Sequence, residues 1–299
     1  MNILVTGGSS TVGKHLKQIL PQATFLSSAD CDLTDYNQTR DYFQSNKPDV
    51  VIHLAALVGG IVDNIQRPVD YLQQNLLINT NTIRASYECG TRKLIALSST
   101  CTYPDQVNSY PMKEEDMFAG PPTPTNFEYA YAKRCMVALI EAYNKQYGMQ
   151  DCYITPSNLY SELDTHKGGR AHYVASLLDK IIEQDSLGGS SIKLLGTGSP
   201  LRQFTYAGDI ALVIKAMIDN NVWASFNVSN PENYSIHKLA RITLDVNGKS
   251  DWTIDYSQPH MNGQARKDVS IDKFLQYFPE FVFTKFADGI KKVYIDKTK

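Results

Sequence analysis

Asn2-Ile3-Leu4-Val5-Thr6-Gly7-Gly8-Ser9-Ser10-Thr11-Val12-Gly13 opens the chain and decides its fold. The first five residues form an apolar run typical of a buried strand, and the apolar periodicity of residues 12–20 predicts a helix after the glycine turn. This order is typical of a dinucleotide-binding unit, in which the backbone of the turn approaches a pyrophosphate at the helix N-terminus. In the G-x-x-G-x-x-G form of the turn Ser10 takes the middle position, and its hydroxyl can bond phosphate. The pyrophosphate contacts expected here are Gly7, Ser9, Ser10, Thr11, Val12 and Gly13.

Strand and helix patterns alternate over the rest of the first half of the chain. Apolar runs predict strands at residues 23–26, 49–56, 93–99 and 152–155, and helical periodicity marks residues 36–45, 68–89 and 127–147. Alternation of this kind predicts an α/β protein with a Rossmann-type, doubly wound parallel sheet. We expect a cofactor-binding domain at residues 1–156. Residues 157–299 are expected to form a smaller α/β part that mainly binds substrate, with some elements returning to the sheet.

Composition narrows the classes of function. The 299 residues carry 29 lysines and arginines against 31 aspartates and glutamates, so a net charge of −2 indicates no nucleic-acid partner. Five cysteines, an odd number without C-x-x-C spacing, favour neither a disulfide framework nor a metal site. No apolar run is long enough for a signal peptide or a membrane span. These features predict a cytoplasmic protein that binds no membrane and acts on a small molecule.

Tyr129 and Lys133 stand four residues apart at the head of the third predicted helix. Residues i and i+4 share a helix face, so the Lys133 ammonium is expected beneath the Tyr129 hydroxyl. A nearby cation lowers the pKa of a phenol, which would prepare the hydroxyl to exchange a proton with a carbonyl or carbinol. Ser99 follows the predicted strand 93–99 and can bond the same oxygen. The three residues together indicate a dehydrogenase site much more specifically than any one of them.

Several fragments in order along the chain extend this pattern. They are Ala55-Ala56-Leu57-Val58-Gly59-Gly60-Ile61, Ser99-Thr100-Cys101-Thr102-Tyr103-Pro104, Glu128 to Lys133, Pro156-Ser157-Asn158-Leu159-Tyr160, His172, Gly196 to Phe204, and Arg266-Lys267. With these fragments the chain resembles the extended short-chain dehydrogenases/reductases. In particular it is similar to the GDP-L-fucose synthase family, which performs 3,5-epimerisation and then 4-reduction of GDP-4-keto-6-deoxy-D-mannose.

The resemblance implies an NADPH-dependent reaction that yields GDP-L-fucose. Cys101 and His172 take the positions of the epimerase acid/base pair, and a thiol and an imidazole both titrate near neutrality. Because the C4 ketone acidifies the protons on C3 and C5, one group can remove a proton while the other delivers one to the opposite face. Ser99 and Tyr129 would hold the enolate oxygen, and Tyr129 would give the proton when hydride reduces C4.

Further contacts follow from the same resemblance. Cofactor contacts are expected at Asp32, Leu33, Ala55, Ala56, Lys133, Pro156, Asn158 and Leu159. Substrate contacts are expected at Asn158, Lys180, Leu195, Arg202, Asn262 and Lys267. Arg202 and Lys267, with Arg266, would clamp the diphosphate. A homodimer built on the helices 68–89 and 127–147 is also implied, whereas His53 and His166 are interpreted as structural.

Departures from the family pattern leave the nucleotide and the sugar less determined than the chemistry. The stretch 161–166 differs from the family's usual one, Leu195 stands where we expect tryptophan, and Asn262 where we expect aspartate. Ser27 and Ser28 follow the second strand without an arginine for a 2′-phosphate, and Asp30 comes late for a ribose 2′-hydroxyl. The choice of NADP over NAD therefore follows the resemblance.

Three alternatives remain. The first is an NAD-dependent 4-epimerase, which has no need of the pair Cys101 and His172. The second is a reductase or 3,5-epimerase acting on a GDP-heptose. The third is a non-catalytic module that senses the cofactor, and the presence of both Tyr129 and Lys133 speaks against it.

Overall fold

The computed structural model describes residues 1–164, 173–258 and 264–299. Its centre is a parallel sheet with the strand order β2-β1-β3-β4-β5-β9. The chain runs outward from β1 to β2 and then continues on the other side of β1, which creates a topological switch point between β1 and β3. The predicted doubly wound sheet is confirmed. Its strands are β1 (Ile3–Thr6), β2 (Thr24–Leu26), β3 (Val50–His53), β4 (Lys93–Leu97), β5 (Cys152–Pro156) and β9 (Phe226–Val228).

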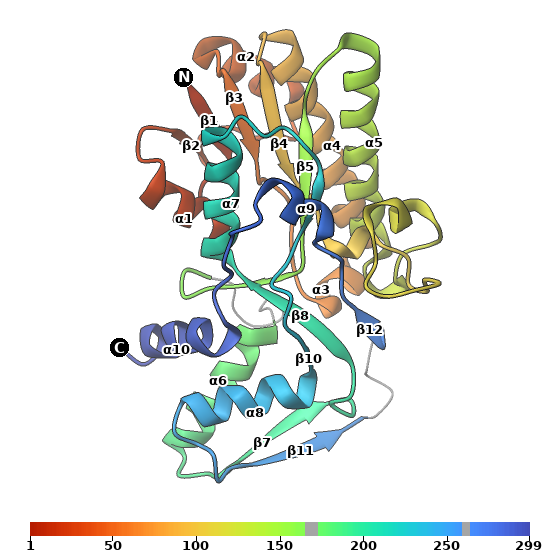
Figure 1. Ribbon diagram of the computed structural model, residues 1–299. Helices are drawn as coiled ribbons and strands as arrows, with labels where there is room; N and C mark the ends of the chain where they lie inside the picture. Colours follow the sequence, from red (N-terminus) through yellow and green to blue (C-terminus); the bar gives the residue numbers. More distant parts are fainter. Residues whose placement is uncertain (165–172, 259–263) are drawn as a thin grey trace.

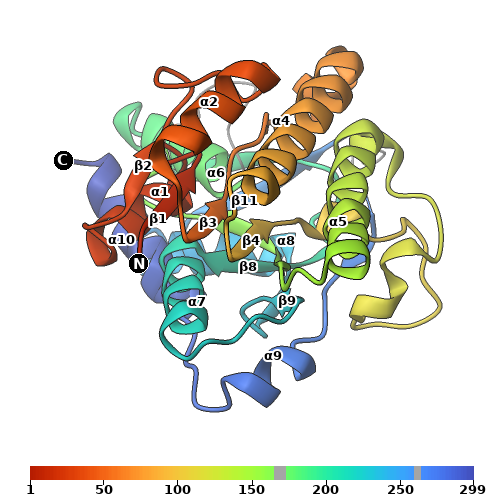
Figure 2. The same cartoon turned by 90° about the horizontal axis from the view of Figure 1, so that it is seen from above.

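Helices cover both faces of this sheet (Figures 1 and 2). Ile3 and Val5 of β1 pack in a core with α1 (Thr11–Ile19) and α7 (Ala207–Asp219). Leu4 faces the opposite core, which contains residues of α2 (Tyr36–Asn46), α4 (Pro68–Glu88) and α5 (Phe127–Tyr147). Because successive side chains point to opposite faces, a strand covered on both sides must be apolar throughout.

Local signals fix the ends of these helices. Ser10 caps α1 by accepting a hydrogen bond from Gly13 N at 3.1 Å, and Asp35 caps α2 in the same way. Gly148 ends α5 in the left-handed conformation (φ 68°), where glycine has no Cβ to clash. The predicted bounds of α5 are confirmed.

A smaller part of the chain packs below the carboxyl ends of the strands (Figure 1). Strand β8 (Leu201–Tyr206) pairs with β6 (Asn158–Tyr160), β10 (Asn233–Ser235) and β12 (Arg266–Lys267), and β7 (Ser191–Leu195) pairs with β11 (Thr253–Ser257). These strands pack with α6 (Tyr173–Ser186), α8 (Ile236–Val246) and α10 (Phe286–Lys297) in two further apolar clusters. Strand β9 pairs with β5 in the large sheet, and α7 packs on one face of that sheet.

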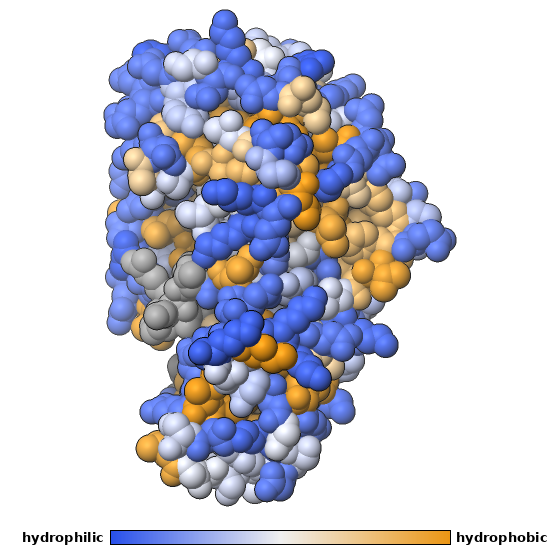
Figure 3. Space-filling view, turned by 90° about the vertical axis from the view of Figure 1, so that its left-hand side faces the viewer, coloured by the Kyte–Doolittle hydropathy of each residue, from blue (hydrophilic) through white to orange (hydrophobic). Residues whose placement is uncertain are grey.

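Short elements complete the described chain. They are α3 (Ile61–Gln66), α9 (Asp272–Tyr277), and the 3-10 helices η1 (Thr100–Thr102), η2 (Glu114–Phe118) and η3 (Pro124–Asn126). Within the described ranges, no helix has the length and apolar character that crossing a membrane requires. The face drawn in Figure 3 is largely hydrophilic with scattered apolar patches, and its outline narrows between the larger and the smaller part.

Candidate active site

Ser99 and Cys101 lie where β4 ends at the carboxyl edge of the sheet. Ser99 caps η1, and its Oγ accepts a hydrogen bond from Cys101 N at 3.2 Å. Thr102 Oγ1 donates to Ser99 O at 2.7 Å, which fixes the turn. The Arg134 side chain of α5 is buried and donates to Thr102 O and to Gly120 O, so the turn is also held from the helix.

Tyr129 meets this turn from the first turns of α5. Its hydroxyl is hydrogen-bonded to Ser99 and lies close enough to Cys101 for the two groups to interact electrostatically. Burial raises the pKa of the Tyr129 hydroxyl above its usual value, and the bond with Ser99 acts in the opposite direction. The prediction that a neighbouring ammonium lowers this pKa was therefore wrong for the chain alone, because burial has the larger effect.

Lys133 explains this difference. Its side chain is 2 % exposed, and Nζ donates to Leu97 O at 2.8 Å. In the described part of the chain this is the one hydrogen bond of the ammonium, so Lys133 is tied to the end of β4 instead of to the tyrosine. Burial lowers the pKa of Lys133 to about 8.

Three residues that the sequence did not single out as functional support this group. The Tyr71 ring packs edge-on against the Tyr129 ring. The Tyr71 hydroxyl fills the space beside Gly59, because a Cβ on Gly59 would lie 2.0 Å from that hydroxyl.

Asn79 bonds His53, which also bonds Thr6 and is fully buried. Burial lowers the pKa of His53 to about 3, in agreement with its structural interpretation. The spacing of residues in the sequence does not predict these contacts. The one feature that could have indicated them is Gly59 in the fragment Val58-Gly59-Gly60-Ile61.

Two cations approach Cys101 from the smaller part. Lys267 Nζ lies 3.5 Å from Cys101 Sγ, and Arg202 is close enough to interact with the same thiol. Burial lowers the pKa of Arg202, whose Nη1 donates to Leu201 O. Within the described residues neither cation has a carboxylate within 4 Å. Arg202 and Lys267 thus stay available for the predicted diphosphate clamp, whereas Arg266 is occupied by Asp268 through bonds of 2.5 and 2.8 Å.

The glycine turn after β1 has the geometry that a pyrophosphate site requires. Gly7 has φ 68°, and a Cβ on it would lie 2.7 Å from Ala55 N. A Cβ on Gly13 would lie 2.7 Å from Gly7 O, so only glycine lets α1 start this close to the turn. The first turn of a helix has N–H groups without intrahelical partners, and Ser9, Thr11 and Val12 stand at this N-terminus.

The other expected cofactor residues lie along the same edge. Pro156 ends β5, Leu159 is half-buried, and Ala55 and Ala56 follow β3. Asn158 Nδ2 donates to Gln203 O at 2.9 Å, so part of its amide is already used. Asp32 is exposed and accepts two bonds from Thr34, whereas the Leu33 side chain is 7 % exposed and belongs to the core.

Asp30 lies in the turn that follows β2. Its carboxylate accepts hydrogen bonds from Ser27 N at 2.8 Å and from Ser27 Oγ at 2.6 Å. These bonds lower the pKa of Asp30. Asp30 N also donates back to Ser27 O, so residues 27–30 form a turn in which the Asp30 carboxylate is already bonded to Ser27.

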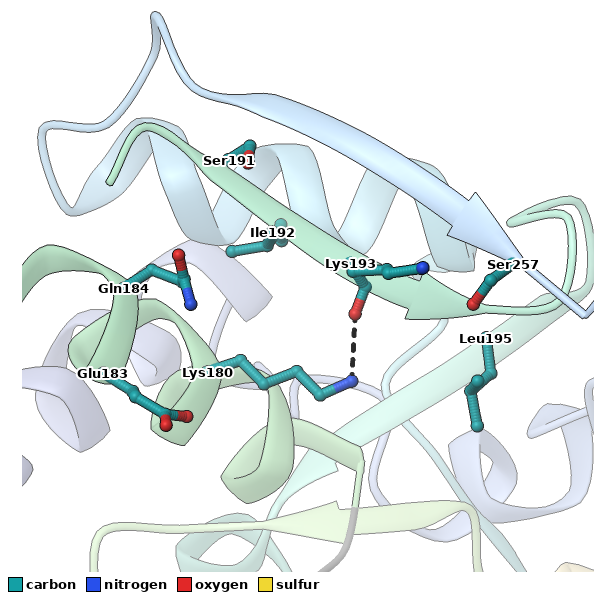
Figure 4. Close-up of a pocket in the computed structure, with 8 residues that line it drawn as sticks. All are labelled: Lys180, Glu183, Gln184, Ser191, Ile192, Lys193, Leu195 and Ser257. Carbon is teal, nitrogen blue, oxygen red and sulfur yellow. Dashed lines mark hydrogen bonds between the residues drawn. The ribbon is translucent and has the colours of Figure 1, made fainter. Parts of the chain in front are cut away.

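Lys180 and Leu195 line an open cavity of about 390 Å³ between α6, β7 and β11 (Figure 4). Lys180 Nζ donates to Lys193 O at 3.0 Å, and Leu195 is 51 % exposed at the far end. Two further predicted residues, His172 and Asn262, lie outside the described residues. Within the described ranges no three His, Cys, Asp or Glu side chains are placed to hold a metal ion.

Comparison with known proteins assigns this arrangement. The sequence pattern of the NAD dependent epimerase/dehydratase family matches residues 3–229. The chain belongs to this family. It is 34 % identical to a GDP-L-fucose synthase of Dictyostelium discoideum, over 97 % of this chain and 93 % of that protein.

Two other relatives share most of their length with the chain. A GDP-L-colitose synthase of Yersinia pseudotuberculosis is 31 % identical, over 87 % of this chain and 86 % of that protein. The crystal structure of a GDP-L-fucose synthetase from Naegleria fowleri bound to NADP superposes with a TM-score of 0.89. It is 31 % identical and covers 99 % of this chain and 92 % of its own. The chain thus belongs to the enzyme branch of the GDP-L-fucose synthases, as the resemblance implied.

Proposed function

We propose that this protein is a GDP-L-fucose synthase, which epimerises GDP-4-keto-6-deoxy-D-mannose at C3 and C5 and then reduces C4 with NADPH. The observation that carries the proposal is the convergence of Ser99, Cys101 and Tyr129 at the carboxyl end of β4. A plain reductase needs Ser99 and Tyr129 but has no use for a thiol beside them. Cys101 therefore supports an isomerase activity in addition to the oxidoreductase activity.

The residues divide the chemistry as follows. Cys101 takes a proton from the carbon next to the ketone, and the electron pair moves onto the ketone oxygen, where Ser99 and Tyr129 donate hydrogen bonds. By the resemblance, His172 delivers a proton to the opposite face of the same carbon. A raised pKa keeps the Tyr129 hydroxyl protonated near neutral pH, so it can give its proton to the C4 oxygen in the reduction step. Arg202 and Lys267 supply the positive charge for the diphosphate.

NADP(H) fits the turn after β1. Gly7 and Gly13 admit no Cβ, and the N-terminus of α1 is favourable for a pyrophosphate. When bound, the cofactor supplies the hydride. Residues 1–156 would hold it, with Lys133, Ala55, Ala56 and Pro156 among its contacts, and residues 157–299 would mainly hold the nucleotide sugar.

Turnover of the purified chain tests the proposal. We expect NADPH absorbance to fall on addition of GDP-4-keto-6-deoxy-D-mannose, with GDP-L-fucose identified as the product by NMR. NADH in a parallel reaction measures cofactor preference, which is informative because residues 27–30 after β2 contain Asp30 and no arginine. Absence of turnover with either cofactor would reject GDP-4-keto-6-deoxy-D-mannose as the substrate.

A second candidate is inversion at C5 and reduction at C4 of a 3-deoxy 4-keto sugar nucleotide, which has no stereocentre at C3. The similarity to a GDP-L-colitose synthase favours it. The two candidates are separated by offering equal concentrations of GDP-4-keto-6-deoxy-D-mannose and its 3-deoxy counterpart. Faster oxidation of NADPH with the 3-deoxy sugar would favour the second candidate.

We also propose a cytoplasmic homodimer. All five cysteines are free, which suits a reducing compartment. The outer faces of α4 and α5 expose a set of large apolar side chains, namely Val69, Leu77, Tyr87, Phe127, Tyr131 and Tyr147. Helices α4 and α5 of two copies would pair as a four-helix interface.

A further inference from the structure

The ammonium of Lys267 donates to the sulfur of Cys101 across 3.5 Å, although the two residues are 166 positions apart in the chain. Its neighbours in sequence do not share this role. Arg266 is held by Asp268, which is 4 % exposed. Within the described residues the Cys101 sulfur is the one side-chain partner of Lys267, and a lysine that merely faced solvent would have none.

Arg202 lies next to Lys267 in the sheet. The two residues are direct partners in the parallel pairing of β12 with β8, and Arg202 also interacts with Cys101. Like charges that face each other across strands are unfavourable unless an anion lies between them. A thiolate at Cys101 supplies such an anion from the chain itself. Among the described residues, the titratable groups near this cluster include the hydroxyls of Tyr129 and Tyr110, and the Arg266 guanidinium lies over the Tyr110 ring.

The position of Lys267 is fixed from both sides. Before it, Gln264 Nε2 donates to Pro104 O and Asp105 O, three and four residues after Cys101. After it, Val269 N donates to Gln203 Oε1, and Ser270 N donates to Met112 O. The strand that carries Lys267 is thus fastened to the same loop that carries Cys101, so the contact is part of the fold and not a chance position of a long side chain.

We propose that Lys267 is a positioning residue whose ammonium orients the Cys101 sulfur and stabilises the thiolate that accepts a proton from the sugar. This inference rests on the proposed function, in which the thiolate forms an S–H bond as the C–H bond breaks and the electron pair moves to the ketone oxygen. The group on the opposite face, which the resemblance gives as His172, then protonates the carbon, and the thiol releases its proton to water. Lys267 itself exchanges no proton in this step. Lys267 therefore acts through Cys101, in addition to its attraction for the diphosphate.

Alkylation of the cysteines by iodoacetamide tests the inference without any sugar. The intact protein is labelled at about pH 7, and the rates at Cys101 and Cys89 are read from the same digest by mass spectrometry. Cys89 is half-buried at the C-cap of α4, does not belong to the outer apolar set of the proposed dimer, and serves as an internal control. In Lys267→Met we expect the Cys101 rate to fall about tenfold, because only the thiolate reacts. Lys267→Arg should retain the rate within about threefold, since it keeps the charge.

Matched variants separate this effect from a change in folding. Lys273→Met removes an exposed lysine from α9 and should leave both rates unchanged. At about pH 9.5 an ordinary thiol is ionised, so the gap between Lys267→Met and the parent should close. If Lys267→Met unfolds, the buried Cys152 will be labelled, and Lys267→Gln then takes its place.

An unchanged Cys101 rate in a folded, charge-neutral variant would overturn the inference. The inference would also be overturned if Lys267→Arg lowered the alkylation rate of Cys101 at about pH 7 as much as Lys267→Met does. Because no nucleotide sugar is present, failure of the proposed substrate leaves these outcomes unaffected. The inference and the proposed function can thus fail separately.

Discussion

At the scale of single residues, the site depends on charge states that the sequence predicts only in part. The spacing of Tyr129 and Lys133 correctly placed both residues on one helix. It did not reveal that Lys133 bonds Leu97 O, or that burial controls both pKa values. Burial depends on what packs around a side chain, and residues from β4, α4 and η1 provide this packing. The contact of Lys267 with Cys101 joins distant segments, so local sequence patterns could not predict it either.

Removing the Tyr129 hydroxyl tests its role as proton donor. We expect Tyr129→Phe to lower the rate of C4 reduction roughly 10²- to 10⁴-fold, because general acid catalysis contributes about this much. Binding of NADPH, measured by fluorescence titration, should stay unchanged. The control is Tyr131→Phe, which alters an exposed tyrosine two residues further along α5. Equal losses in both variants would argue for a structural role of the Tyr129 hydroxyl.

At the scale of elements, the helices and strands followed the sequence pattern closely. Helix α5 has the predicted bounds, whereas β3 and β4 end two or three residues before their apolar runs do. Residue pairing between strands stops at His53 and Leu97, and beyond them only single bonds such as Ser98 N to Ile154 O continue. The sequence of loops such as residues 104–126 did not predict their conformation. Hydrogen bonds to distant segments, such as that from Gln264 Nε2 to Asp105 O, hold these loops.

The glycine turn makes a prediction for α1. Gly13→Ala should abolish measurable binding of NADPH, since the added Cβ would lie 2.7 Å from both Gly7 O and Gly8 O and push the helix away. Isothermal titration calorimetry measures this binding directly. Gly120→Ala is the matched control, because its Cβ would meet Pro104 at an ordinary 3.4 Å. Full binding by Gly13→Ala would contradict the assignment of the turn.

Asp151, at the start of β5, makes stability depend on pH. Burial raises the pKa of its carboxyl from 3.8 to about 6, although Leu94 N donates to it. The folded chain therefore binds the proton more tightly than the unfolded chain. The stability from this group is complete below about pH 4 and is lost as the pH rises through about 6.

Asp151→Asn should remove this dependence. We expect the variant to gain stability relative to the parent between about pH 4 and 7, by at most roughly 3 kcal/mol. Urea unfolding at about pH 4 and pH 7 measures the difference in free energy of unfolding between the variant and the parent. Asp41→Asn on the exposed face of α2 controls for the loss of one negative charge. A constant difference across this range would contradict the account of Asp151.

At the scale of the whole molecule, the proposed dimer depends on the outer faces of α4 and α5. Leu77 lies near the middle of α4 and is 39 % exposed. Leu77→Arg should convert the dimer to a monomer in sedimentation velocity, because a charge would be buried without a partner. Leu187→Arg introduces the same charge after the end of α6 and should leave the dimer intact. A parent chain that sediments as a monomer would reject the dimer itself.

The central claim is that one site performs both epimerisation and reduction, and a reaction in D₂O tests it most directly. The intact protein is mixed with NADPH and GDP-4-keto-6-deoxy-D-mannose in D₂O, and the product is examined by NMR. The account predicts GDP-L-fucose with deuterium at C3 and C5, where Cys101 and its partner exchange protons with solvent, and with hydrogen from NADPH at C4. A product reduced at C4 that carries no deuterium at C3 or C5 would contradict it.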